Sequence, residues 1–281
     1  MINKKELIKK IVARSIVVFV LLLLYFPIVV LIIFSFTPAT AMATWEGFSF
    51  SLYRDLFTSS NSDIERLRMA ILNTFVIAVV SSLIAVLLGT FTAIGMFHLK
   101  RRSKSALTAG VNITVINAEV VTGIAFAILF MGLAGGINVM GYWTLIIAHV
   151  MFTTPFVILA VLPRLYRLNP NVYEASQDLG AGSVRTLFTV IVPQIIPAMI
   201  SGFALAFTIS LDDFVVSSYV NGAHIETISI WLYDMAIKRS IPAVARALST
   251  LIFLLAFIAL IVLYIQNKRS QKAFKKNLLN K

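Results

Sequence analysis

The sequence contains no cysteine and little charge, since Asp, Glu, Lys and Arg together make up only 13% of its 281 residues. The absence of cysteine excludes a disulfide-stabilised fold, a thiol nucleophile and a thiolate metal site. An ordinary soluble domain has about 25% charged residues, and at 59% hydrophobic content this chain could not cover its surface with polar groups. The composition therefore excludes a soluble enzyme, a disordered chain and an ordinary nucleic-acid-binding domain.

The sequence also lacks the motifs of the common enzyme classes. None of its 13 glycines begins a G-x-x-x-x-G-K-[ST] phosphate-binding loop, so we do not expect the chain to hydrolyse ATP alone. No pair of catalytic carboxylates and no Ser/His/Asp set stands out. The three histidines are too scattered to suggest a metal site. We expect a non-catalytic chain that binds no cofactor or metal itself.

What the sequence has instead is long apolar runs. A bilayer core about 30 Å thick needs roughly 20 apolar residues in a helix, and the runs are of this order. We therefore predict an all-α integral membrane protein that forms a single transmembrane domain over residues 1–281. Its six predicted spans are residues 16–36, 69–97, 106–133, 139–162, 195–216 and 248–266. The third is the least regular, because Asn112, Asn117 and Glu119 lie inside it.

The distribution of lysine and arginine predicts the orientation of these spans, since cytoplasmic loops carry an excess of both residues. Eighteen of the 24 lie in the two terminal segments and in the loops after the second and fourth spans. The basic C-terminal tail, residues 267–281, belongs to this group. The split predicts that both termini are cytoplasmic. It also accounts for the net charge of +12 without a nucleic-acid partner.

The loop 163–194, between the fourth and fifth spans, has a distinctive pattern. Asn169 followed by Pro170 is typical of a helix start. Gly180 is typical of a helix end in the left-handed conformation, and Ser183 can cap a second helix. We predict two short helices joined at a glycine, an elbow whose apolar stripe suits a groove in another protein.

The spacing in this elbow resembles the EAA loop of ABC importer permeases. Glu174, Ala175 and Ser176 are followed after three residues by Gly180, and after nine more by Val-Ile-Val and Pro193. The family pattern is E-A-A, three residues, G, nine residues and I-x-L-P, so Ser176 and the two valines are conservative departures. The resemblance implies a type I ABC importer permease with six helices. It also implies that this loop couples the chain to an ATPase subunit, with Glu174 and Gly180 at the contact.

A second resemblance narrows the branch of that family. The segment SLDDFVVSSYVNG, residues 210–222, is similar to the S-x-D-D-x-V-V-S-S-[FY]-x-x-G segment of spermidine/putrescine permeases. Asn-Ala-Glu-Val at 117–120 resembles their S-P-D-I piece, with Glu119 in place of Asp. The resemblance implies a polyamine importer in a bacterial plasma (inner) membrane. Its other parts would be a second permease, an ATPase dimer that binds ATP and Mg, and an external polyamine-binding protein.

Three acidic residues, Glu119, Asp212 and Asp213, lie at membrane depth, while spans two to five contain no lysine or arginine. Carboxylates in hydrocarbon are costly, so they are protonated, pair with the partner permease or line a wet path for a cation. The polyamine interpretation favours the third of these, a wet path for a cation. We predict a substrate path that includes these acids together with Phe214 and Tyr219, whose rings favour a cation. Either aspartate could instead cap a helix break.

Two other functions stay open at this point. A permease of an ABC importer for another solute, such as an iron complex, an organic anion or an osmolyte, would have the same elbow. Basic residues inside the spans would favour an anion, and there are none. A proton-coupled secondary transporter could use Glu119 and Asp212 as relay groups. Such a carrier has no ATPase for the elbow to contact.

Overall fold

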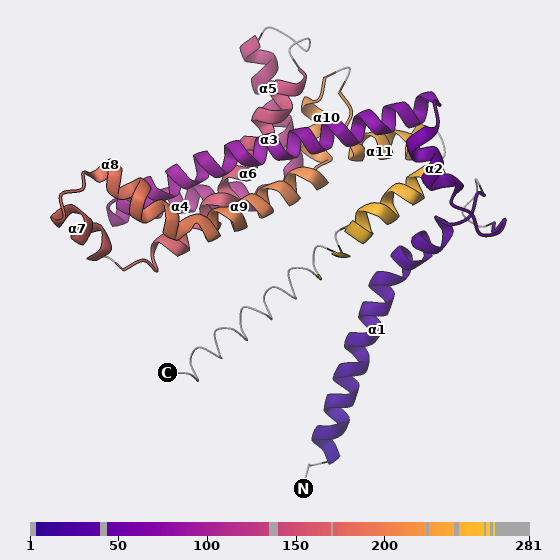
Figure 1. The fold of residues 1–281 in the computed structure, drawn as a ribbon, viewed down its shortest axis with the longest axis horizontal. Helices are drawn as coiled ribbons and strands as arrows, with labels where there is room; N and C mark the ends of the chain where they lie inside the picture. Colours follow the sequence, from indigo (N-terminus) through magenta and orange to yellow (C-terminus); the bar gives the residue numbers. More distant parts are fainter. Residues whose placement is uncertain are drawn as a thin grey trace. The chain divides into compact units, whose positions relative to one another are not determined.

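In the computed structural model of the chain, every regular element of the described residues is a helix (Figure 1). The structure describes residues 4–39, 44–134, 140–169, 171–222, 225–238, 242–255, 257–258 and 261. The prediction of an all-α fold is confirmed for these residues. The chain divides into two compact units, one formed by Met1–Glu65 with Met235–Lys281 and the other by Arg66–Asp234.

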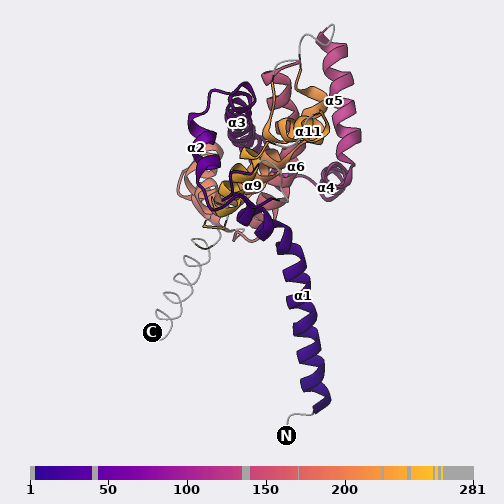
Figure 2. The ribbon, with the colours of Figure 1, turned by 90° about the vertical axis from the view of Figure 1, so that its right-hand side faces the viewer.

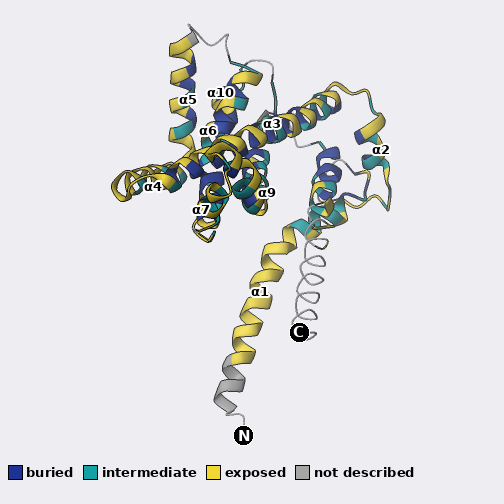
Figure 3. Cartoon of the chain, turned by 60° about the vertical axis from the view of Figure 1, so that its left-hand side comes forward, coloured by how far each residue is buried: buried dark blue, intermediate teal, exposed yellow. Residues whose placement is uncertain are grey.

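The first unit contains the long helix α1 (Lys4–Phe34), the short helix α2 (Ser51–Thr58) and an apolar helix, Val244–Leu255. None of the apolar stretch of α1 is buried within the chain, as its yellow colour in Figure 3 shows. Just after α1, the hydroxyl groups of Ser35 and Tyr53 share a hydrogen bond of 2.6 Å. Since Tyr53 lies in α2, this bond ties α2 to the end of α1.

The second unit is built on three long helices: α3 (Ser62–His98, most of which belongs to this unit), α6 (Tyr142–Leu165) and α9 (Val192–Asp212). Their shared core contains Ala85 and Ala93 of α3, Val157 of α6, and Ile195 and Ala206 of α9. The alanines allow the three helices to pack closely around the larger side chains of α6. The burial of these apolar faces stabilises the unit.

Within the described residues, four helical stretches are long and apolar enough to cross a membrane. They are Lys10–Phe34, Ser62–His98, Tyr142–Leu165 and Ser183–Asp212. These stretches overlap the first, second, fourth and fifth predicted spans.

The third predicted span, 106–133, is not one straight helix. It consists of α4 (Arg101–Ile116) and α5 (Glu119–Ala134), which are bent by 102° relative to each other (Figure 2). Asn117 lies at the break in an extended conformation, and its side-chain amide donates a hydrogen bond of 3.0 Å to the hydroxyl of Thr122. The break arises because an asparagine side chain can hydrogen-bond locally and so competes with the helical backbone.

The fifth predicted span, 195–216, also contains a break. α9 ends at Asp212, and the short helix α10 (Val215–Val220) follows. A further helix, α11 (Ile228–Lys238), comes next in the chain. The described part of the sixth predicted span, 248–266, lies in helix Val244–Leu255 and at residues 257–258 and 261. The rest of that span and the tail 267–281 lie outside the described residues.

The segment between α6 and α9 contains the two short helices expected from the sequence. They are α7 (Asn171–Asp178) and α8 (Ser183–Thr186). A π-helix, Leu187–Ile191, joins α8 to α9 without interruption. The helical stretch therefore runs continuously from Ser183 to Asp212.

Gly222, which follows α10, lies against the backbone of Met140, just before α6, and a substitution there tests this close approach. It has φ +70°, and a Cβ added here would collide with the carbonyl oxygen of Met140. We expect Gly222→Ala to destabilise the purified chain by about 1–3 kcal/mol, because the alanine is strained and has no space. Thermal unfolding in detergent, followed by tryptophan fluorescence, measures the effect. Gly95→Ala is the matched control, since an added Cβ there has no neighbour within 4 Å. Equal midpoints for the two variants would contradict this packing.

Candidate functional site

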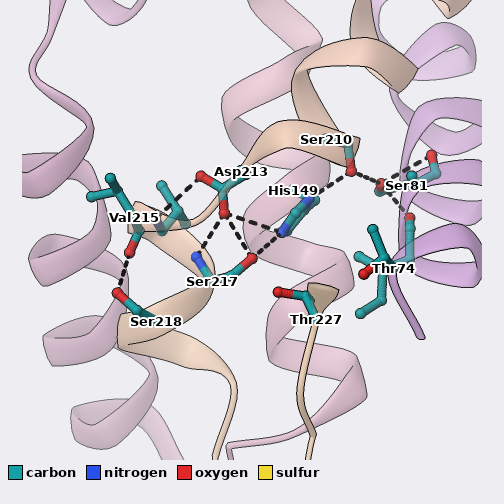
Figure 4. A network of polar contacts seen from close by, with 12 residues as sticks. Thr74, Ser81, His149, Ser210, Asp213, Val215, Ser217, Ser218 and Thr227 are labelled. Carbon is teal, nitrogen blue, oxygen red and sulfur yellow. Dashed lines mark hydrogen bonds and ion pairs between the residues drawn. The ribbon is translucent and has the colours of Figure 1, made fainter. Parts of the chain in front are cut away.

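A connected set of buried polar side chains crosses the second unit where α9 ends (Figure 4). The hydroxyl of Ser81 in α3 lies 3.2 Å from that of Ser210 in α9, which lies 2.6 Å from Nδ1 of His149 in α6. Nε2 of His149 lies 3.0 Å from the hydroxyl of Ser217 in α10. Ser217 in turn donates a hydrogen bond of 2.7 Å to the carboxylate of Asp213. The set therefore connects α3, α6 and α9 with the residues that follow the helix break.

Asp213 stabilises the start of α10. Its extended conformation, with ψ 124°, ends α9, and its carboxylate then accepts the backbone N–H groups of Val216 at 3.2 Å and Ser217 at 2.7 Å. The first N–H groups of a helix have no partner within the helix, so a side-chain acceptor satisfies them. The side chain of Asp213 is only 4% exposed. Its geometry thus fits the capping alternative, and its burial does not fit the prediction that it faces the solute.

His149 is a member of this set that the sequence pattern does not predict. Its side chain is 1% exposed, and besides the two serines it lies 3.6 Å from the carboxylate of Asp213. Its ring also packs against Phe152, with 5.0 Å between the ring centroids. The sequence does contain one indication of its role. His149 is an ionisable residue inside a predicted apolar span, and such a residue usually faces the interior of the helix bundle.

The other two predicted acids lie exposed at the two helix breaks. Glu119 is the first residue of α5, and Asp212 is the last residue of α9. Tyr219, on α10, is 39% exposed. A Cβ added to Gly123 would lie 2.7 Å from the Tyr219 ring, so α5 and α10 pack together at this point. Gly123 is one turn beyond Glu119 on the same face of α5, which brings Glu119 to the side of the unit that carries Tyr219.

Phe214, the remaining residue predicted for the path, lies between the two halves of the break. It is half-buried, and its ring packs against Tyr233 of α11 with 4.5 Å between the centroids. The structure therefore divides the five predicted path residues. Glu119, Asp212 and Tyr219 are exposed, Phe214 supports α11, and Asp213 is buried.

The elbow between α6 and α9 turns at Gly180, as the sequence predicts. Gly180 has φ +84°, its N–H donates to the carbonyl of Gln177 at 2.8 Å, and the N–H of Ala181 donates to the carbonyl of Ser176 at 3.1 Å. This pair of bonds is the Schellman motif, which ends a helix with a residue in the left-handed conformation. Glycine adopts that conformation without a steric penalty.

Side chains also join the two short helices of the elbow. The hydroxyl of Ser176 in α7 lies 3.0 Å from that of the buried Thr186 in α8. Gln177 donates a hydrogen bond of 3.2 Å to the hydroxyl of Ser183. The prediction that Ser183 caps α8 is wrong, because Gly182 holds the N-cap position with no side-chain bond. The serine hydroxyl instead accepts a bond from across the elbow.

The apolar residues of the elbow face in two directions. Leu187 and Ile191 line an apolar pocket with Ile94 and Phe97 of α3. Three others point outward, with exposed fractions of 89%, 71% and 54%: Leu179, Val184 and Phe188. Glu174 and Ala175 are exposed as well. The elbow thus presents an apolar surface with a carboxylate beside it.

Pro193 lies where the elbow passes into α9. It cannot donate a backbone hydrogen bond, and its ring would crowd the preceding turn of a regular α-helix. The turn before it is a π-helix in which the N–H of Val192 reaches the carbonyl of Leu187, five residues back. The wider turn gives room for the proline ring, and the helix continues into α9.

In the described part of the chain, no group of three or more His, Asp or Glu side chains could hold a metal ion. The chemistry that the two regions offer is the attraction of a cation to exposed carboxylates and the docking of a protein on an apolar surface.

Comparison with known proteins identifies the family. Residues 85–274 match the family described as "Binding-protein-dependent transport system inner membrane component". The chain is 34% identical over 240 residues to the spermidine/putrescine transport system permease protein PotC of Haemophilus influenzae. The aligned residues cover 85% of this chain and 90% of that protein. It is 31% identical to the putrescine transport system permease protein PotI of Escherichia coli K12, over 82% of this chain and 81% of that protein.

Solved structures are similar as well. A bacterial ABC transporter involved in the import of the acidic polysaccharide alginate contains a chain that matches with a TM-score of 0.67, over 96% of both chains. A chain of a bacterial alginate ABC transporter, in complex with alginate pentasaccharide-bound periplasmic protein, matches with a TM-score of 0.64 over 93% of both. The sequence identities are 16% and 15%, so this similarity concerns the fold alone.

The family match covers more than half of the chain, and the PotC relative aligns with most of it. The resemblance to ABC importer permeases that the elbow motif suggests is therefore confirmed. The apolar helices and the family agree on a multi-pass protein of the bacterial inner membrane. This chain belongs to the family of binding-protein-dependent transport system inner membrane components.

Proposed function

We propose that this chain is the permease subunit of an ATP-driven importer that carries polyamines, such as spermidine and putrescine, into the cytoplasm. One structural observation carries the proposal. Two carboxylates, those of Glu119 and Asp212, lie exposed at helix breaks in a domain whose second to fifth predicted spans contain no lysine or arginine. The relatives named as spermidine/putrescine and putrescine permeases support the choice of cargo.

The chemistry of the breaks suits a polyamine. An ammonium group gains charge-assisted hydrogen bonds from a carboxylate. At the end of α9 the last backbone carbonyls have no helical partner and carry partial negative charge, so they add to the attraction of Asp212 for a cation. The ring of Tyr219 offers a surface for the methylene chain, with a cation–π contribution of about 0.5–2 kcal/mol.

The elbow suits contact with a separate ATPase. The chain has no phosphate-binding loop of its own. Glu174, Leu179, Val184 and Phe188 are exposed together on the elbow and form a surface for a partner protein. We propose that Gly180 shapes this surface, while the bond between Ser176 and Thr186 keeps the two elbow helices together.

The continuous helix beyond the elbow gives the ATPase a mechanical route to the substrate path. The stretch from Ser183 to Asp212 contains 30 residues and ends at an exposed acid. At about 1.5 Å per residue its length is roughly 45 Å, enough to cross the bilayer. A displacement of the elbow by the ATPase would therefore move the Asp212 end of the same helix.

The proposed complex contains a second, homologous permease, an ATPase dimer that binds ATP and Mg, and a periplasmic polyamine-binding protein. In this arrangement the elbow and both termini are cytoplasmic, and the two units form one permease domain. The unburied apolar face of α1 contacts lipid and the second permease. The chain itself is non-catalytic and binds no nucleic acid.

An importer for an anionic solute is the second candidate, since the similar alginate transporters carry an acidic polysaccharide. The absence of lysine and arginine from the second to fifth predicted spans disfavours it here. Interrupted helices also occur in proton-coupled secondary transporters, but the family match and the elbow favour an importer that contacts an ATPase. The geometry of the described residues has no feature specific to an iron complex or an osmolyte.

The proposal is tested by uptake of radiolabelled spermidine and putrescine into cells that lack this gene and other polyamine importers, with the gene absent or restored. We expect uptake only when the gene is restored. It should cease on ATP depletion and persist with a proton uncoupler. Uptake that survives loss of ATP, or that is equal in both strains, would contradict the proposal.

The acids at the breaks give a more local prediction. We expect Glu119→Gln and Asp212→Asn each to lower spermidine uptake at subsaturating concentration by about tenfold or more, because each removes a charged hydrogen-bond acceptor. Asp55→Asn in the first unit is the control for neutralising an acid outside the path. Normal uptake in both variants, at normal amounts of inserted protein, would remove these acids from the path.

The elbow gives a second prediction. Gly180→Val strains the left-handed turn, so it should disrupt the Schellman motif and sharply reduce co-purification of the ATPase subunit while leaving membrane insertion intact. Gly182→Ala is the matched control, because Gly182 has φ −63° and an added Cβ meets nothing within 4 Å. Equal recovery of the ATPase with both variants would show that the turn at Gly180 does not shape the docking surface.

A further inference from the structure

His149 and its two serine neighbours form a buried cluster to which the proposed function assigns no role. The two ring nitrogens point to opposite sides of the α9–α10 break (Figure 4). Nδ1 meets Ser210, three residues before Asp213, and Nε2 meets Ser217, four residues after it. One side chain on α6 therefore contacts both halves of the broken helix.

The directions of these hydrogen bonds follow from the contacts of Ser217. Its hydroxyl donates to the carboxylate of Asp213, so its oxygen accepts the bond from Nε2–H of His149. In the neutral ring, Nδ1 then accepts the hydroxyl of Ser210. The hydroxyl of Ser81 donates to the carbonyl of Ile77. In this assignment both ring nitrogens of His149 and the hydroxyl protons of Ser210 and Ser217 have partners, while the 3.2 Å contact between the hydroxyls of Ser81 and Ser210 has no proton of its own. Buried polar groups with satisfied partners favour one structure.

We infer that His149 is a positioning residue that holds the α9–α10 break in one geometry by bonding to Ser210 on one side and Ser217 on the other. This inference rests on the proposed function, because the break separates Asp212 from the segment that carries Tyr219. When His149 is removed, Ser217 loses its donor and Ser210 loses its acceptor. α10 then keeps its capping carboxylate and its packing against α5, but it loses its hydrogen-bonded link through α6 to Ser210 of α9, so the position of Tyr219 relative to Asp212 is held less firmly.

Substitutions at position 149 distinguish hydrogen bonding to both serines from a role in which the side chain only fills space. His149→Asn retains an acceptor near the Nδ1 position and can serve Ser210, whereas His149→Gln can reach Ser217 as a donor. Neither side chain bonds to both serines. Both variants, and His149→Leu, should therefore loosen the break, while Ser210→Ala and Ser217→Ala should each have part of the same effect.

The absence of cysteine allows the geometry of the break to be measured directly. Ser218 lies exposed on α10, so Ser218→Cys creates the only thiol of the chain. Its rate of labelling by a polar maleimide is measured with the complete transporter in membranes, without cargo, in the His149 and His149→Gln backgrounds. Phe57→Cys, on the exposed face of α2, is the matched control thiol.

We expect His149→Gln to change the labelling rate at position 218 about tenfold, the order of factor that follows from leaving a buried polar group without its partner. The rate at position 57, the amount of inserted protein and co-purification of the ATPase should not change. Uptake at subsaturating spermidine should fall by a similar factor. If His149→Gln does not insert, Ser210→Ala and Ser217→Ala provide the same comparison.

An unchanged labelling rate at position 218 would overturn the inference, even if uptake falls. An equal change at positions 218 and 57 would also overturn it, since it would indicate a general loss of structure. Because labelling needs no cargo, a local change at 218 supports the positioning role even in a transporter that carries no polyamine. Failure of the proposed function is therefore distinguishable from failure of this inference.

Discussion

The hydrogen bonds that the carboxylate of Asp213 accepts are the interaction on which the arrangement of α9 and α10 depends. In an apolar environment, backbone N–H groups without a partner are costly, and irregular backbone is tolerated only where protein or water satisfies it. Asp213 satisfies the N–H groups of Val216 and Ser217 from within the chain. A helix that would otherwise run on can therefore end at Asp212 and start again at Val215.

The break changes what the neighbouring residues can do. Asp212 becomes the end of a helix, where unpaired carbonyls reinforce its negative charge. Tyr219 is carried on a separate short helix that packs against α5 at Gly123. The elbow and Asp212 lie at opposite ends of one continuous helical stretch, so in the proposed importer a single element connects the ATPase contact with the substrate path. The π-turn before Pro193 accommodates the proline within that stretch.

The sequence predicts the long apolar helices and the turn of the elbow well, for a physical reason. A run of about 20 apolar residues has few alternatives to a membrane helix, and a glycine after a short helical pattern has few alternatives to a left-handed end. Both signals are local. Four of the predicted spans overlap long apolar helices, and Gly180 has the expected conformation.

The breaks and the buried cluster are harder to predict because they depend on contacts that are distant in sequence. His149 meets Ser210 and Ser217, which lie 61 and 68 residues away. The pattern around Asp212 and Asp213 shows two adjacent acids but not which of them caps the next helix and is buried. Hydropathy averaged over a window likewise combines Asn117 and Ala118 with their apolar neighbours, so the sequence predicts α4 and α5 as one span. The sequence does indicate where the helices are interrupted, since polar residues occur at both breaks.

The proposed import of polyamines is tested by transport in proteoliposomes that contain the purified components: this chain, its second permease, the ATPase dimer and the periplasmic binding protein. We expect spermidine-loaded binding protein to stimulate ATP hydrolysis, and spermidine to accumulate inside only when ATP is present at the ATPase. Accumulation driven by a proton gradient in the absence of the ATPase would contradict it. So would ATP hydrolysis that responds equally to loaded and empty binding protein, with no spermidine inside.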